Sequence, residues 1–184
     1  MNLIKKYSIR VIEMKKFVPD MYKKNIYEIN YEKLKNMGKK YLFFDLDNTL
    51  ISYLESVPTK ENKKLFEKLK KMGFVPLIFS NSHSERLRPF KEELNVPTLS
   101  GNMKPLKKGY KRVLSKYNKD ECVFIGDQIM TDVIGAKRNG LYVIFLDRIN
   151  DKEPIYTKFW RFFESFVLKK YEKKNYLVKG KYYE

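Results

Sequence analysis

Apolar runs of strand length recur along this 184-residue chain and alternate with segments of helical period. The expected strands cover residues 41–45, 74–80, 96–100, 122–126 and 141–146. Runs that are apolar on both faces belong to parallel sheets that helices cover on each side. The sequence therefore predicts an α/β fold, a three-layer sandwich with a parallel sheet in the middle.

The segments between these runs carry helix start and stop signals. The signals are Thr59 as an N-cap and Gly73 as an end, a short helix over 84–94, Pro105 as a start, and Thr131 and Gly140 around a fourth helix. Strand and helix alternate from residue 41 to residue 146, which favours one doubly wound domain. We place it at residues 37–150, between a basic N-terminal extension (1–36) and a basic, aromatic C-terminal tail (151–184).

Polar side chains follow the predicted strands at the points where the strands end. They are Asp45, Asp47 and Thr49, then Ser80 and Asn81, then Lys104 ahead of a helix, and finally Asp127 and Asp132. The carboxyl ends of parallel strands meet at one edge of a sheet, near the point where the strand order reverses. We therefore expect these side chains to form one site.

The residue types suit metal-assisted phosphoryl transfer. The Asp45 carboxylate can attack phosphorus and hold the phosphoryl group as an acyl phosphate. Asp45 and Asp127 supply the hard oxygen ligands that Mg²⁺ prefers. Lys104 and Ser80 can hold the phosphoryl oxygens, and Asp47 can protonate the leaving oxygen and later deprotonate a water.

Residues 41–50, 77–82, 102–105 and 124–135 resemble the four motifs of the haloacid dehalogenase (HAD) superfamily of phosphatases, subfamily IIIA. The resemblance implies a HAD-like Rossmannoid fold, a Mg²⁺ cofactor and an aspartyl-phosphate intermediate.

The same resemblance assigns roles to single residues. Asp45 is implied as the nucleophile, and Asp47 as the general acid/base whose backbone carbonyl also binds the metal. Asp127 is implied as the main acidic metal ligand, with Asp132 in support. Thr49 is implied as a stabiliser of the motif loop, and Ser80 and Lys104 as phosphate ligands. We expect Thr49 and Asn81 in the substrate-binding group as well, although Asn81, next to Ser80, either orients the phosphate or closes a turn.

A narrower resemblance runs from about Phe17 to the tail and includes "GDQIMTDVIGAKRNG" and "TKFWRFFESFVLKK". These stretches resemble the bacterial YqeG family, relatives of the mitochondrial phosphatidylglycerophosphate phosphatase. The resemblance implies removal of the terminal phosphate of phosphatidylglycerophosphate in phospholipid metabolism. The intervals between the motifs hold only elements of ordinary length, so no cap domain is expected and the site should suit a large substrate or a head group at a surface.

The tail predicts an amphipathic helix. Its apolar stripe consists of Phe159, Phe162, Phe163, Phe166 and Val167, with basic residues elsewhere on the wheel. Such a stripe suits an anionic lipid interface, and it equally suits docking on the domain's own sheet or on a second copy. The sequence does not set the oligomeric state.

Charge and cysteine content bear on partners and compartment. The net charge is +17, which either serves an anionic partner or reflects a lysine-rich composition. One cysteine, Cys122, leaves no internal disulfide, and the N-terminus lacks a signal-peptide core, so we expect a cytoplasmic enzyme, with peripheral contact at the inner face of the membrane. Two alternatives remain open: a phosphatase of a nucleotide or other soluble phosphomonoester, and a basic RNA or ribonucleoprotein binding module on the same frame.

Overall fold

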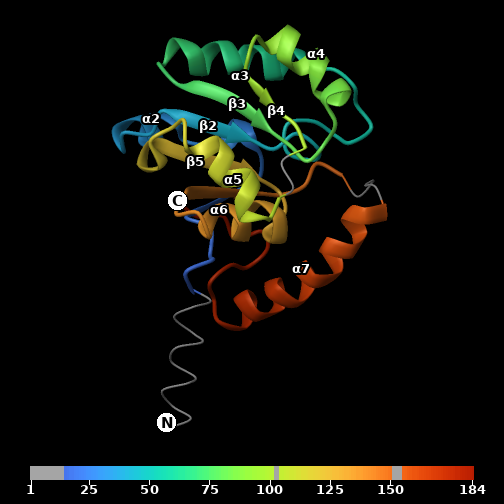
Figure 1. The fold of residues 1–184 in the computed structure, drawn as a ribbon. Helices are drawn as coiled ribbons and strands as arrows, with labels where there is room; N and C mark the ends of the chain where they lie inside the picture. Colours follow the sequence, from blue (N-terminus) through green and yellow to red (C-terminus); the bar gives the residue numbers. More distant parts are fainter. Residues whose placement is uncertain (1–14, 102–103, 151–154) are drawn as a thin grey trace.

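A six-stranded parallel sheet forms the centre of the molecule, in the order β1-β6-β5-β2-β3-β4 (Figure 1). The computed structural model describes residues 15–101, 104–150 and 155–184. The strands are β1 (Met21–Lys23), β2 (Tyr41–Phe44), β3 (Val75–Phe79), β4 (Thr98–Leu99), β5 (Cys122–Gly126) and β6 (Tyr142–Leu146). The predicted fold class, an α/β sandwich on a parallel sheet, is confirmed.

Helices cover both faces of the sheet (Figure 1). They are η1 (Ile26–Glu28), α2 (Tyr31–Asn36), α3 (Lys60–Lys71), α4 (Ser84–Leu94), α5 (Lys107–Leu114), η2 (Lys119–Glu121), η3 (Ile129–Val133), α6 (Ile134–Lys137) and α7 (Ile155–Lys173). Side chains alternate along β2, so Leu42 and Phe44 pack under α3 and α4 while Phe43 packs towards α5. Each face therefore has its own apolar core.

The structure agrees closely with two of the predicted helices. Thr59 caps α3 in a capping box with Asn62, and α4 covers the segment 84–94. The expected cap at Thr131 is wrong, because a π-helical turn, η3, starts at Ile129 and carries Thr131 inside it. The Thr131 hydroxyl donates to the side chain of Gln128 at 3.0 Å instead of capping a helix.

Both chain ends of the described part join the sheet. Strand β1 pairs with β6, and Tyr22 exchanges two backbone hydrogen bonds with Tyr183, each of 3.0 Å. The sequence places Tyr22 in a lead-in and Tyr183 in a tail, and neither was expected in the sheet. The domain boundaries at 36 and 150 stay predictions, but β1, before residue 36, belongs to the central sheet, and Tyr183, after residue 150, bridges to that strand.

The strand order places the reversal point between β2 and β5, since the chain passes from β2 to β3 and β4 on one side and from β5 to β6 on the other. The loops after β2 and β5 therefore open next to each other at the carboxyl edge. Between Asp45 and Ser80 the chain forms a loop, α3 and β3. Between Ser80 and Lys104 it forms α4 and β4, apart from residues 102–103, which lie outside the described ranges.

Candidate active site

The Lys104 ammonium joins two buried carboxylates. Its Nζ lies 2.5 Å from Asp45 Oδ1 and 2.8 Å from Asp132 Oδ1. Phe124 and Phe79 flank the ammonium, with ring centroids 5.2 and 5.9 Å from Nζ. Residues from the ends of β2 and η3 and from the loop before α5 thus meet in a buried environment.

Asp127 completes an acidic cluster with Asp45 and Asp132. Each of the three offers a carboxylate oxygen, and these oxygens all lie within 4.8 Å of one another. The Thr49 hydroxyl donates to Asp127 Oδ1 at 3.1 Å. Three buried carboxylates with hard oxygen donors fit a divalent cation such as Mg²⁺. The cation would offset the part of their negative charge that the Lys104 ammonium does not neutralise.

Burial shifts the pKa values of this cluster. Loss of hydration raises the pKa of the Asp45 carboxyl well above its ordinary value, and the Lys104 ammonium opposes that effect only in part. Burial alone would lower the pKa of Lys104, but Asp132 and Asp45 together raise it above its usual range. Lys104 therefore remains a cation, and Asp45 needs positive charge nearby to stay ionised.

The loop after β3 supports this arrangement. Ser80 is buried, and its hydroxyl oxygen accepts a hydrogen bond from the Ser82 backbone N–H at 3.1 Å. The Asn81 side chain makes two hydrogen bonds to the backbone of Lys104, to its carbonyl at 3.1 Å and from its N–H at 2.8 Å. Asn81 thus connects the loop after β3 to the loop that carries Lys104.

Comparison with known protein families gives the family of the chain. The family described as haloacid dehalogenase-like hydrolase matches residues 18–140, more than half of the chain. The chain belongs to the haloacid dehalogenase-like hydrolases.

Two curated relatives have phosphatase names. "Probable phosphatase YqeG" of Bacillus subtilis (strain 168) is 34% identical over 163 residues, which is 88% of this chain and 95% of that protein. "Phosphatidylglycerophosphate phosphatase 1, chloroplastic/mitochondrial" of Arabidopsis thaliana is 23% identical over 185 residues, 94% of this chain but 53% of that protein. The predicted family and the prediction of a HAD-type phosphatase are thereby confirmed.

A solved structure supports the fold alone. The crystal structure of an uncharacterized protein from Listeria monocytogenes serotype 4b superposes with a TM-score of 0.50 at 21% identity, covering 62% of this chain and 85% of that one.

In this hydrolase, Asp47 points to partners that the sequence did not predict. The Ser82 hydroxyl donates to Asp47 Oδ2 at 2.7 Å, and Arg86 Nη2 donates to Oδ1 at 2.8 Å. Arg86 also donates to the backbone carbonyls of Glu55 and Tyr53. Arg86 lies in the first turn of α4. The sequence predicts only a helix there, and no motif identifies Arg86 as a site residue.

The tail helix also reaches the site of the hydrolase. Arg161 on α7 forms an ion pair with the Asp127 carboxylate and donates to the Asp127 backbone carbonyl at 3.0 Å. Sequence reasoning assigned the tail to lipid or to docking and missed both Arg161 and its partner Glu164. Phe159 and Trp160 of the same helix lie among the residues whose side chains the structure does not describe.

Gly126, the last residue of β5, makes room for Asp132. A Cβ atom at this position would lie 2.5 Å from Asp132 Oδ2 and 2.7 Å from Asp132 Cβ. The Asp132 carboxylate uses this space to accept from the Gln128 backbone N–H at 3.1 Å while it holds Lys104. A glycine is therefore required at the end of the strand.

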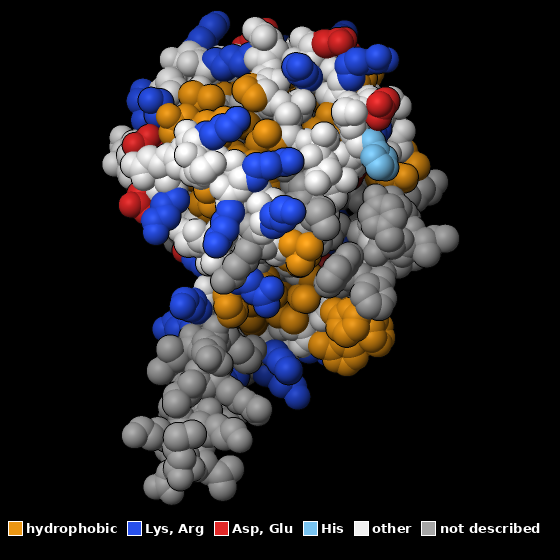
Figure 2. Space-filling model, viewed as in Figure 1, with side chains coloured by type: hydrophobic (Ala, Val, Ile, Leu, Met, Phe, Trp, Pro, Cys, Tyr) orange, Lys and Arg blue, Asp and Glu red, His pale blue; other side chains and the backbone are white. Residues whose placement is uncertain are grey.

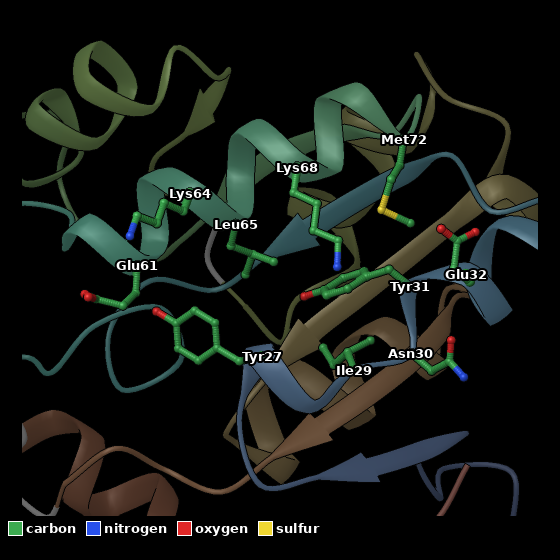
Figure 3. A pocket seen from close by; sticks show the side chains of 10 residues that line it. All are labelled: Tyr27, Ile29, Asn30, Tyr31, Glu32, Glu61, Lys64, Leu65, Lys68 and Met72. Carbon is green, nitrogen blue, oxygen red and sulfur yellow. The ribbon is translucent and has the colours of Figure 1, made fainter.

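A groove of about 470 Å³ lies elsewhere, between the N-terminal segment and α3 (Figure 3). Tyr27 and Tyr31 line one side of it, and Lys64 and Lys68 reach over it from α3. None of the eight predicted site residues is among those that line it. The acidic cluster, and not this groove, has the groups that the chemistry of the family needs.

Proposed function

We propose that this chain is a Mg²⁺-dependent phosphomonoester hydrolase that works through an aspartyl phosphate on Asp45. The observation that carries the proposal is the 2.5 Å contact between Asp45 and Lys104 within the buried acidic cluster. The same ammonium that keeps the nucleophile ionised can hold a phosphoryl oxygen as the bond to Asp45 forms.

The residues of the site then divide the steps of the reaction among them. Asp45 attacks phosphorus, and the leaving oxygen takes a proton from Asp47. Asp47 subsequently removes a proton from the water that hydrolyses the acyl phosphate. Mg²⁺, held by Asp127 and Asp45 and supported by Asp132, would neutralise the charge of the phosphate dianion and orient it. Ser80 and Lys104 would hold the phosphoryl oxygens.

We further propose that the substrate is phosphatidylglycerophosphate at the membrane surface. The name of the Arabidopsis relative supports this substrate class. The exposed face of the tail helix supports action at the membrane surface. On α7 the side chains of Phe162, Phe163 and Phe166 are 60%, 42% and 50% exposed, and they contribute to a hydrophobic patch over the helix (Figure 2). The opposite face of α7 packs on the domain through Val167, Leu168 and Tyr171.

Exposed aromatic rings beside lysines suit the boundary of an anionic bilayer. Lys169 and Lys170 follow the patch on α7 and are exposed. Within the described residues, no helix is both long and apolar enough to cross a bilayer. We therefore propose peripheral binding at the inner face of the membrane.

The test is Mg²⁺-dependent phosphate release from phosphatidylglycerophosphate in mixed micelles, next to soluble nucleotide, sugar and glycerol phosphates. Wild-type protein is compared with Asp45→Asn, which keeps the shape of the side chain, and with Asp120→Asn as a control, since Asp120 is an exposed acid in η2, before the amino end of β5. We expect turnover of the lipid by wild type and Asp120→Asn, and none by Asp45→Asn or in EDTA.

Other outcomes separate the parts of the proposal. Turnover of a soluble phosphomonoester alone would keep the mechanism and replace the substrate. Absence of any turnover, together with RNA binding that weakens steeply with salt, would support the basic binding module instead.

A further inference from the structure

Arg161 contacts Asp127 at two points, the carboxylate and the backbone carbonyl. Its Nη2 forms the ion pair with Asp127 Oδ2, and its Nη1 donates to the Asp127 backbone carbonyl at 3.0 Å. Since Thr49 donates to the other carboxylate oxygen, Oδ1, both oxygens and the main chain of Asp127 are held. Arg161 comes from α7, 34 residues beyond Asp127 in the chain.

Glu164 secures this contact from one turn further along α7. It is 4% exposed, and its Oε2 lies 3.0 Å from Arg161 Nη1. Its other oxygen, Oε1, accepts from the backbone N–H of Ile129 at 3.2 Å, at the start of η3. The pair therefore holds the loop that carries Asp127 at both of its ends.

We infer that Arg161 is a positioning residue for the metal ligand Asp127, so that α7 forms one wall of the catalytic centre and strengthens its binding of the divalent cation. The inference rests on the proposed function, which makes Asp127 a ligand. It adds a residue outside the four motifs to the site, and it gives the tail helix a task that does not depend on lipid.

Two effects of Arg161 on the cation oppose each other. Its positive charge repels a cation bound at Asp127, whereas its hydrogen bonds keep the carboxylate in one orientation. Glu164, 3.0 Å from the guanidinium, offsets part of the repulsion when its carboxyl group is ionised. Loss of a partner that orients a metal ligand typically weakens metal binding by about 10-fold to 100-fold, and we expect orientation to dominate here.

The test compares Arg161→Ala, Arg161→Lys and Glu164→Gln with wild type and with Arg88→Ala, an exposed arginine on α4 that serves as the matched control. Titration calorimetry with Mg²⁺ reports metal affinity without turnover. In parallel, kcat, KM and the Mg²⁺ concentration for half-maximal activity are measured with p-nitrophenyl phosphate. Thermal unfolding checks that each variant is folded.

We expect Arg161→Ala to weaken Mg²⁺ binding by about 10-fold or more. Excess Mg²⁺ should restore kcat, and KM should change less than twofold. The Mg²⁺ affinity of Arg161→Lys should lie between those of wild type and Arg161→Ala, because one ammonium cannot make both contacts to Asp127. Glu164→Gln should weaken Mg²⁺ binding less than Arg161→Ala does. Arg88→Ala should match wild type.

Four results would overturn the inference. Tighter Mg²⁺ binding in Arg161→Ala would make Arg161 a competitor of the metal. Unchanged affinity with a raised KM would make it a substrate contact, and unchanged values throughout would leave it a structural residue only. Wild-type protein that binds no Mg²⁺ would refute the proposed function itself, and this inference with it.

Discussion

The Arg86 guanidinium and the Asp47 carboxylate form an ion pair of 2.8 Å at the mouth of the site. Arg86 is held in turn by the backbone carbonyls of Glu55 and Tyr53 in the loop after β2. The contact joins α4 to the first motif loop and gives the proposed acid/base residue a fixed position.

Substitution Arg86→Ala should lower kcat by about 10-fold to 100-fold, because Asp47 would lose the contact that orients it for proton transfer. The Mg²⁺ affinity should not change. Steady-state kinetics with p-nitrophenyl phosphate and calorimetry check both expectations, with Arg88→Ala on the same helix as control. An effect on KM alone would instead identify Arg86 as a substrate contact.

Substitution Lys104→Met should destabilise the protein by about 3–5 kcal/mol, because Asp45 and Asp132 would remain buried without their cation. Added Mg²⁺ should recover part of this loss. Urea unfolding with and without Mg²⁺ measures both effects. The control is Lys63→Met, which breaks an exposed ion pair with Glu93 and should cost less than about 1 kcal/mol. Equal losses in the two variants would contradict the prediction.

Substitution Gly126→Ala should abolish most of the activity. The new Cβ would displace the Asp132 side chain, and crowding of this kind typically costs about 1–3 kcal/mol of stability. Gly140→Ala is the comparison, because Gly140 has a φ of +77° and a Cβ there would meet only the Lys119 Nζ, at an ordinary contact distance of 3.9 Å. That variant should lose stability through backbone strain but keep its turnover number. Full activity in Gly126→Ala would show that Asp132 can move without consequence.

Stability should fall with rising pH because of Glu164. Burial raises the pKa of this carboxyl from 4.5 to about 7, against the effects of Arg161 and the Ile129 N–H, while Asp127 adds to the rise. A raised pKa in the folded state means that the folded protein holds the proton more tightly than the unfolded chain does. The stabilising contribution of Glu164 is therefore complete below about pH 4.5 and is lost as the pH rises through about 7.

Urea unfolding of wild type and Glu164→Gln across pH 4.5 to 8 tests this expectation. The stability of wild type should decrease relative to that of Glu164→Gln over this interval, since glutamine does not titrate. A constant difference between the two proteins would mean that Glu164 is ionised throughout.

Replacement of Phe162, Phe163 and Phe166 together by serine should abolish binding to vesicles that contain phosphatidylglycerol. Among the α7 side chains that the structure describes, these three rings are the exposed large apolar ones. Vesicle sedimentation measures binding, and Leu106→Ser, which changes a side chain that is 53% exposed on another helix boundary, is the control. Undiminished binding would place the lipid contact elsewhere. Point substitutions are preferable to removal of the tail, which would also remove Arg161.

Much of the fold followed from the sequence because its signals are local. Apolar runs of strand length and the capping box at Thr59 act within a few residues, and they were sufficient for β2, β3, β5, β6, α3 and α4. Strand β1 was not predicted, since three residues in a basic segment give no period. The π-helical start of η3 also escaped prediction, because a cap residue and a residue inside a turn look alike in sequence.

In the candidate site, too, local sequence signals identify some residues and only the tertiary structure identifies the others. Asp45, Lys104, Asp127 and Asp132 could be named from the sequence. Asp45 and Asp127 directly follow strands, Lys104 precedes a helix and Asp132 lies five residues after Asp127, and a parallel sheet brings such ends together. Arg86 and Arg161 could not be named in this way, since each is one of many cations on a helix whose periodicity is ordinary. Only the packing of α4 and α7 against the carboxyl edge decided which cation meets which carboxylate. Contacts between distant segments depend on how whole helices are oriented, and a sequence pattern holds no signal for that orientation.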